Sequence, residues 1–158
     1  MTMDPDSFRA ALGRFASGVT VITSRGADGR DMGMTASAFC SVSLDPPLVL
    51  VCVAHDASLH PVLVLGQPFA VNVLESGQEA LSRRFAGTEL ERFEGLGFSR
   101  CPSGPALLDD VLAHIECRVE MLHPGGDHTI CVGRVEAVNV NRGHPLLYYR
   151  GGYAQLER

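Results

Sequence analysis

The stretch His114-Ile-Glu-Cys-Arg-Val-Glu-Met121 alternates polar and apolar residues along its whole length. Such alternation is typical of an antiparallel strand with one buried and one solvated face. His123-Pro-Gly-Gly-Asp127 then predicts a turn, and 128–140 predicts the returning strand. The apolar residues of this second strand change phase near Gly133, which predicts a β-bulge there. A long hairpin is therefore expected to form the framework of the fold.

Further segments have the composition of strands: 19–24, about 33–42, 48–54, 69–74 and 145–149. The first two flank a turn-rich stretch and are expected to pair as a hairpin. Leu48–Ala54 is a continuous apolar run, so we expect it to be buried on both faces. Seven or so strands with a few short helices predict a mainly β fold, a small β-barrel rather than alternating βαβ units.

Helices are predicted in three places. The first extends from about Pro5 to Ser17, with Asp4 as its N-cap. A second, short helix is expected over 58–65, and a third over 76–86, where Ser and Glu have capping-box spacing. The glycine- and proline-rich segment 90–105 is expected to be an exposed loop.

The composition narrows the classes of function. The chain has 158 residues, 46% hydrophobic and 20% charged, which predicts one globular domain over 1–158. The net charge is −5 and all 13 cations are arginine, which excludes lysine chemistry and argues against nucleic-acid binding. No apolar run approaches the roughly 20 residues that span a bilayer, and the first residues do not resemble a secretory leader. We therefore expect a cytoplasmic protein that does not bind membranes.

Cysteines are present at positions 40, 52, 101, 117 and 131. An odd number without a C-x-x-C pair favours reduced thiols over disulfides or a zinc site, and no metal site is expected. Cys40 or Cys131 with a distant histidine could imitate a thiol nucleophile, but a core position is the commoner role. Asp109-Asp110 could form a carboxylate pair, although a solvated loop is the more common context. The chain contains no G-x-G-x-x-G, G-x-S-x-G or H-E-x-x-H motif.

The segment Gly33-Met-Thr-Ala-Ser-Ala-Phe39 combines small residues with hydroxyl groups, and Ser41 and Ser43 follow it. Small side chains let a planar ligand approach the backbone, and hydroxyls with exposed N–H groups can hold a phosphate without lysine. A plain Ser/Thr-rich strand remains the alternative. His128 follows a glycine turn and begins a strand, so it could face a ligand or solvent.

Several blocks occur together in a fixed order. They are Gly18-Val-Thr-Val-Ile-Thr23, Gly33-Met-Thr-Ala-Ser-Ala-Phe39, Ser41-Val-Ser-Leu-Asp-Pro-Pro-Leu-Val-Leu-Val51, Phe69-Ala-Val-Asn72, Arg84-Phe-Ala-Gly87, Gly126-Asp-His128 and Pro145-Leu-Leu-Tyr-Tyr149. From about Phe8 to Leu156 the chain resembles the short-chain flavin reductases, the reductase components of two-component flavin-dependent monooxygenases. The resemblance implies an FMN-binding split β-barrel, a Greek-key-like antiparallel barrel that forms a homodimer. It also implies reduction of FMN or FAD by NADH or NADPH, with reduced flavin passing to a partner monooxygenase.

The resemblance also implies site residues. Those expected to bind cofactor are Met34, Thr35, Ala36, Ser37, Ala38, Phe39, Ser41, Val51, Cys52, Val53, Ser58, Arg84, Phe85, His128, Tyr148, Tyr149, Arg150, Gly151 and Tyr153. Either Arg83 or Arg84 could meet a flavin phosphate. His128 is expected beside the nicotinamide as the catalytic residue, orienting the ring as a hydrogen-bond donor and not as an obligatory general acid.

Two other functions remain open. A flavoprotein oxidase of the pyridoxamine-phosphate oxidase type needs a lysine- or arginine-rich pocket for its substrate phosphate. The absence of lysine from this chain disfavours that function. The second alternative is a non-enzymatic flavin- or haem-binding module. The Gly-Asp-His turn and the tyrosine-rich C-terminal strand favour a reductase over this module, because a module that only stores or senses its ligand needs no site for a second ring. Flavin-dependent oxidation of a nicotinamide separates the reductase from the binding module.

Overall fold

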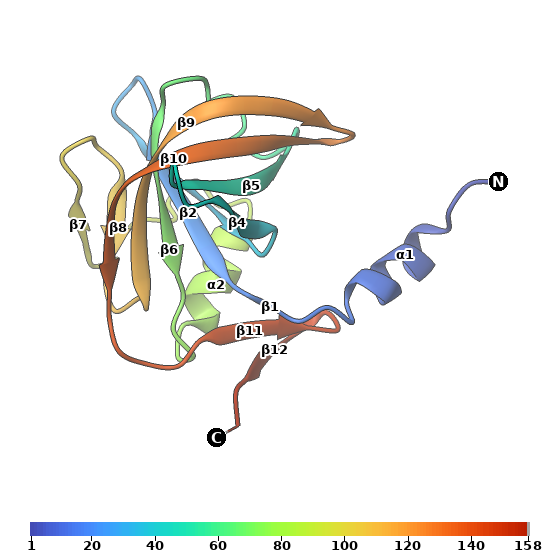
Figure 1. The fold of residues 1–158 in the computed structure, drawn as a ribbon. Helices are drawn as coiled ribbons and strands as arrows, with labels where there is room; N and C mark the ends of the chain where they lie inside the picture. Colours follow the sequence, from blue (N-terminus) through green and yellow to red (C-terminus); the bar gives the residue numbers. More distant parts are fainter. Residues whose placement is uncertain (158) are drawn as a thin grey trace.

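The expected long hairpin is the largest element of the computed structural model, which describes residues 1–157 (Figure 1). Strand β9 (Ala113–Gly125) pairs with β10 (His128–Val140) through a tight turn at Gly126, whose φ of 68° favours glycine. The register shifts between Val132 and Gly133, so the predicted bulge is confirmed. A second shift between Val135 and Ala137 was not expected.

The described residues form two helices and twelve strands. Besides β9 and β10 these are α1 (Pro5–Leu12), β1 (Ser17–Gly18), β2 (Thr20–Arg25), β3 (Asp31–Ala36), β4 (Phe39–Ser43), β5 (Leu48–Ala54), β6 (Pro68–Val73), α2 (Glu79–Ala86), β7 (Phe98–Arg100), β8 (Ala106–Leu108), β11 (Leu146–Tyr149) and β12 (Gly152–Gln155). The mainly β class is confirmed.

The main sheet has seven strands in the order β3-β2-β6-β9-β10-β5-β4, and every neighbouring pair is antiparallel. Strand β3, at one end of this order, also contacts β5 near the other end, so the sheet curves back on itself. A smaller sheet, β1-β11-β12, and the hairpin β7-β8 complete the fold. In Figure 1, β11 and β12 run past the end of α2.

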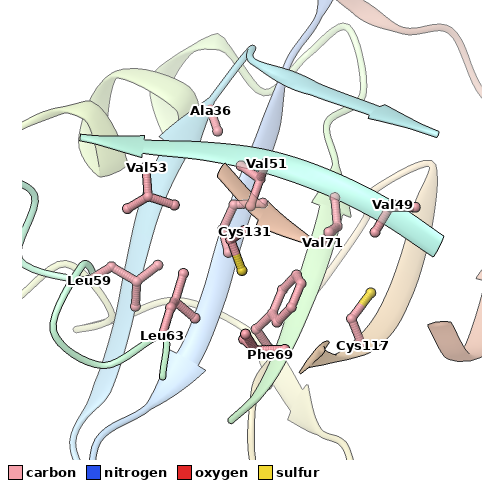
Figure 2. Close-up of a cluster of buried hydrophobic side chains, with 12 residues drawn as sticks. Ala36, Val49, Val51, Val53, Leu59, Leu63, Phe69, Val71, Cys117 and Cys131 are labelled. Atoms are coloured by element: carbon pink, nitrogen blue, oxygen red, sulfur yellow. The ribbon is translucent and has the colours of Figure 1, made fainter. Parts of the chain in front are cut away.

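The concave side of the curved sheet holds the larger hydrophobic core. Figure 2 shows Val49, Val51 and Val53 projecting from β5 into a cluster that includes Leu59, Leu63, Phe69, Cys117 and Cys131. The intervening residues of β5 are only half-buried, so the expectation of a strand buried on both faces is wrong. The reason is that one face packs on this core, whereas alternate residues point to the outer side of the sheet.

A second cluster lies between β2, α2, β8 and β11. Its buried members are Val19, Val21, Leu74, Phe85, Leu108, Val111 and Leu146. Phe85 packs directly against β3, where a Cβ at Gly33 would come within 2.7 Å of its ring. The absence of a side chain at Gly33 therefore sets the close approach of α2 to β3.

Two predicted helices differ from the structure. Residues 58–65 form successive turns and not a helix, because backbone bonds such as that from Val62 N–H to the Leu59 carbonyl join residues three apart and no continuous ladder of bonds four apart forms. Helix α2 begins at Glu79 without a side-chain cap. The capping box is absent because the Ser76 hydroxyl donates to the Glu75 carboxylate at 2.6 Å.

Three other boundaries differ. The strand expected over 33–42 is interrupted at Ser37-Ala38, which separates β3 from β4. The loop 90–105 contains β7, and its Phe93, Leu96 and Phe98 pack on the second core. Strand β12 differs from the expectation of a short tail after Gly151-Gly152, because residues 152–155 pair with β11.

Helix α1 extends away from the rest of the chain (Figure 1). Asp4 caps it as predicted, accepting from the Ser7 N–H at 3.0 Å, but the helix ends at Leu12 instead of Ser17. None of its residues is buried, and the nearby Phe15 is 81% exposed. Within residues 1–157 no helix is long and apolar enough to cross a membrane.

Candidate functional site

A cavity of about 220 Å³ lies between β3, α2 and the C-terminal strands. It is lined by Val19, Thr35, Ser37, Ser82, Ala86, Tyr148 and Tyr153. Four residues expected from the resemblance meet here although they are far apart in the sequence: Thr35, Ser37, Tyr148 and Tyr153. We call this the hydroxyl cavity, after its serines, threonine and tyrosines.

Ser82 connects the walls of the hydroxyl cavity. The Thr35 hydroxyl donates to the Ser82 carbonyl at 2.6 Å, and the Ser82 hydroxyl is 2.7 Å from the Tyr153 hydroxyl. Ser82 is completely buried, and Tyr148 and Tyr153 meet edge to face at 5.5 Å. These contacts hold β3, α2 and β12 in a fixed arrangement around the cavity.

The interruption after β3 supplies backbone donors beside the cavity. Ser37 and Ala38 are exposed, and their N–H groups make no backbone hydrogen bond within residues 1–157. Exposed consecutive amides with adjacent hydroxyl groups are a favourable arrangement for binding a phosphate. This part of the Met-Thr-Ala-Ser-Ala-Phe segment therefore has the expected chemistry.

The two arginines of α2 have different surroundings. The Arg83 guanidinium lies 4.9 Å from the centre of the Tyr153 ring and pairs with Glu79 at 2.8 Å. The hydrogen bond to Glu79 raises the pKa of Arg83 further above its already high value. Arg84 instead donates to the carbonyls of Glu91 and Glu94 and holds the loop after α2. Arg83 is therefore the arginine beside the hydroxyl cavity.

Ser58 lies at a separate cavity of about 320 Å³, beneath the loop after α2. Arg92 from that loop donates to the Gly33 carbonyl at 2.9 Å and so ties the loop to β3. Asp28, Asp31 and Glu89 also line this cavity, which makes its charge mixed. Nothing in this arrangement brings Ser58 into the hydroxyl cavity.

His128 begins β10, and its side chain is 44% exposed. Its Nδ1 lies 2.7 Å from an Asp127 carboxylate oxygen, and this hydrogen bond lowers the pKa of Asp127. Because an ionised carboxylate only accepts, Nδ1 carries the proton. The neutral ring then presents Nε2 as an acceptor, and Nε2 donates only when the ring is protonated. The donor role of His128 toward a nicotinamide stays a prediction.

The other expected residues lie partly in the core and partly on the surface. Ala36, Val51, Val53 and Phe85 are buried, and Met34 and Phe39 pack against the larger core. Cys52 lies on β5 and is partly exposed, and Ser41 lies on β4 and is exposed. Tyr149, Arg150 and Gly151 are exposed where β11 turns into β12, and the Arg150 N–H donates to the Gly13 carbonyl at 2.9 Å.

The thiols do not form a nucleophilic site. Burial raises the pKa of Cys131 to about 12, so this thiol stays protonated near neutral pH. Cys40 is exposed and makes no hydrogen bond through its sulfur to the described residues. The thiol alternative therefore has no activated cysteine among the residues described.

Sequence reasoning missed Ser82, Asp127 and Arg92 as contributors. Ser82 lies two residues before the quoted Arg84-Phe-Ala-Gly87 block, and Asp127 is the middle residue of the Gly126-Asp-His128 block. Asp127 therefore lies within a recognised motif, and Ser82 lies beside one. For Arg92 the sequence held no comparable signal, since its role depends on how the loop folds back on β3.

The donors around the hydroxyl cavity fit the phosphate and planar ring of a flavin. The described residues that line the cavity carry hydroxyl groups, aromatic rings and aliphatic carbon, with no carboxylate among them. A phosphate is favoured by the adjacent amides and by Arg83, and a flat ring is favoured by the small residues of the segment after β3.

Comparison with protein families matches residues 12–157 to the flavin reductase-like domain. The reductase component of 4-hydroxyphenylacetate 3-monooxygenase from Thermus thermophilus is 44% identical over 152 residues, covering 96% of each chain. An NADH-dependent flavin reductase from a Rhodococcus species is 43% identical over 155 residues, 97% of this chain and 87% of the relative. The NADH:FAD oxidoreductase of Streptomyces globisporus, solved with NAD and FAD fragments, superposes with a TM-score of 0.91. Its identity is 39%, over 99% of this chain and 97% of that chain.

Proposed function

The chain belongs to the flavin reductase-like domain family, and from this premise we propose that it reduces a flavin with a nicotinamide and supplies the reduced flavin to a separate monooxygenase. Its relatives of similar length include an NADH-dependent flavin reductase and a monooxygenase reductase component. The observation within this chain that carries the proposal is the hydroxyl cavity, bordered by two exposed amides and Arg83.

The bound flavin supplies the hydride acceptor, and the protein's task is to align two rings. Ser37 and the amides of Ser37 and Ala38 would hold the flavin phosphate, with Arg83 as the neighbouring cation. Thr35, whose hydroxyl donates to the Ser82 carbonyl, would hold this segment in position. His128 would orient the carboxamide of the nicotinamide through Nε2, and Asp127 keeps its ring in one tautomer. The remaining residues carried over from the family, among them Cys52, Ser58 and Arg84, are proposed to shape or support the same site.

We propose NADH as the hydride donor, because two of the similar proteins are named for NADH. FMN and FAD are both proposed as acceptors, since the phosphate donors described here would serve either. The flavin oxidase alternative keeps the same fold, but no observation in this chain favours it over the reductase.

We further propose that this single domain is a split β-barrel that works as a homodimer. The curvature that brings β3 against β5 supports the barrel. The exposed apolar residues of α1 support the dimer, as does the separation of His128 from the hydroxyl cavity in one chain. Free thiols in all five cysteines support a reducing compartment and hence a cytoplasmic location.

The direct test is the loss of NADH absorbance with purified protein and added FMN or FAD. We expect flavin-dependent oxidation of NADH, and slower oxidation of NADPH under the same conditions. A tightly bound flavin without nicotinamide oxidation would contradict the reductase and favour an oxidase or a binding module. A purified monooxygenase component from the same cell should form its hydroxylated product only when this protein, flavin and NADH are all present.

A further inference from the structure

Another cavity lies apart from the hydroxyl cavity and has no role in the proposed function. Its volume is about 420 Å³, within the range of small-molecule sites. It lies between the turns that follow β5 and the tip of the β9–β10 hairpin. The lining residues are Val53, His55, His60, Pro61, Leu63, Val64, Leu122, His123, Pro124, Thr129 and Cys131. We call this the histidine pocket.

Three imidazoles supply most of the polar groups of the histidine pocket. His60 Nε2 lies 2.8 Å from the Thr129 hydroxyl, and the rings of His55 and His60 meet edge to face at 5.0 Å. The ring nitrogens of His55 and His123 make no hydrogen bond to any residue in the described range. They are therefore available to a ligand.

The remaining walls exclude several classes of ligand. Leu63, Val64, Leu122 and two prolines make them largely apolar, and the lining residues, all described, include no aspartate, glutamate or arginine. A phosphate would lack a permanent cation, and an ammonium ion would lack a carboxylate. A metal ion is not favoured either, because the described part of the chain contains no group of three or more His, Cys, Asp or Glu side chains that could hold one.

What the pocket does offer is largely apolar walls against which a ring can pack, together with three imidazoles. Imidazole accepts a hydrogen bond from a hydroxyl group and, when it carries a proton, donates one to an oxyanion. Aromatic rings pack favourably edge to face against imidazole and aliphatic side chains. We propose that the histidine pocket binds a small phenol, with its ring packed against the apolar walls and its hydroxyl group hydrogen-bonded to His55 or His123.

The phenol site is distinct from the site of flavin reduction. Of the residues carried over from the family, only Val53 lines the histidine pocket, and the hydroxyl cavity shares none of its lining. Thr129 faces the pocket, whereas the adjacent His128 points to the opposite side of β10, as successive strand residues do. Phenol and NADH should therefore bind without competing.

The first experiment titrates the full chain with phenol, toluene and cyclohexanol, followed by the NMR signals of the imidazole carbons. We expect saturable one-site binding of phenol, at least tenfold tighter than that of toluene, which lacks the hydroxyl, and of cyclohexanol, which lacks the aromatic ring. Equal affinity for the three compounds, or no saturation by phenol, would overturn the proposal. Displacement of phenol by FMN or NADH would overturn the claim of a separate site.

Variants then locate the bound phenol. Val64→Trp should fill the pocket and weaken phenol at least tenfold, whereas Val138→Trp, an exposed valine elsewhere, should not. The double variant His55→Phe with His123→Phe should remove the preference for phenol over toluene and leave toluene binding unchanged. His144→Phe, an exposed histidine outside the pocket, is its matched control. Circular dichroism establishes folding of each variant, and since binding is measured without NADH oxidation, its outcome does not depend on the reductase activity.

Discussion

Arg83 and Arg84 are adjacent in the sequence but serve different parts of the molecule. Successive residues of a helix point about 100° apart, so only one of the two can face the hydroxyl cavity. Arg83 lies over Tyr153, and Arg84 bonds to the loop after α2. A sequence motif could place an arginine near the phosphate site, but only the orientation of α2 on β3 decides which one it is.

This difference predicts opposite outcomes for two similar variants. Arg83→Gln should raise the KM for flavin about five- to tenfold with little change in thermal stability, because an exposed cation near a phosphate is lost. Arg84→Gln should lower the melting temperature and affect flavin binding less, because it releases the carbonyls of the loop. Steady-state kinetics with varied flavin and thermal unfolding measure the two effects. Equal changes in flavin KM for both variants would argue against this assignment.

His128 is expected to act on nicotinamide binding. His128→Ala should raise the KM for NADH more than it lowers kcat, since the ring orients the nicotinamide and does not take part in the chemical step. Asp127→Asn should show a smaller effect of the same kind. The pKa of Asp127 is lowered by His128, so its carboxylate keeps its charge above the ordinary carboxyl range and loses it only as the pH falls through that lowered value. The NADH KM of the wild-type protein should therefore show no inflection from Asp127 between pH 5 and 9, within the error of a pH series. An equal loss in kcat and kcat/KM for His128→Ala would indicate a transition-state role instead.

The cysteines are expected to react in an order set by burial. The pKa values of Cys117 and Cys131 are raised to about 12, chiefly by burial, and the thiolate is the reactive form. A disulfide reagent at pH 8 should therefore modify exposed Cys40 first and Cys52 more slowly, because burial and the neighbouring Cys40 raise the pKa of Cys52. Mass spectrometry of partly labelled protein should find Cys117 and Cys131 unmodified until the protein unfolds. Cys40→Ser should remove the fast phase.

At the scale of elements, the packing of β10 beside its bulge depends on a missing side chain. A Cβ at Gly133 would lie 2.8 Å from Cε1 of Phe69 and closer still to the end of its ring. Gly133→Ala should therefore destabilise the protein by about 1–3 kcal/mol. Denaturant unfolding measures the change, and Gly18→Ala, where the added carbon meets no atom within 4 Å, is the control. Phe69→Leu should lower the free energy of unfolding less in the Gly133→Ala variant than in the wild-type protein, because the smaller side chain makes room for the added methyl group. Additive losses would contradict the collision.

Elements with a strong local pattern could be predicted from the sequence, and those that depend on distant contacts could not. The alternation from His114 to Met121 and the phase change at Gly133 are local signals, and both strands formed as expected. Strand β12 begins at the second of two glycines, Gly152, and its pairing with β11 is what makes it a strand. Likewise the sequence named Thr35 and Tyr153, but their connection through Ser82 arises only when α2 lies between β3 and β12.

At the scale of the whole molecule, α1 is an element whose residues a single chain leaves unburied. Phe8 and Leu12 are 54% and 55% exposed, on a helix whose residues are all unburied. The proposed homodimer would cover them, because exposed apolar groups of this size favour association. Phe8→Ser with Phe15→Ser should therefore shift the molecular mass measured by light scattering from dimer toward monomer. Leu44→Ser, which changes an apolar residue that is 93% exposed outside α1, is the control. A wild-type protein that is monomeric at every concentration would refute the dimer.

The order of strands in the main sheet also determines when the fold can be completed. β4 and β5 join the sheet only through β10, which is made near the end of the chain. A ribosome therefore releases the apolar Leu48–Ala54 segment well before its partner strand exists. Contacts between residues so far apart in sequence form slowly, because a long loop must close first. We expect β5 to be the last strand protected from hydrogen exchange during refolding, and the segment most in need of a chaperone during synthesis.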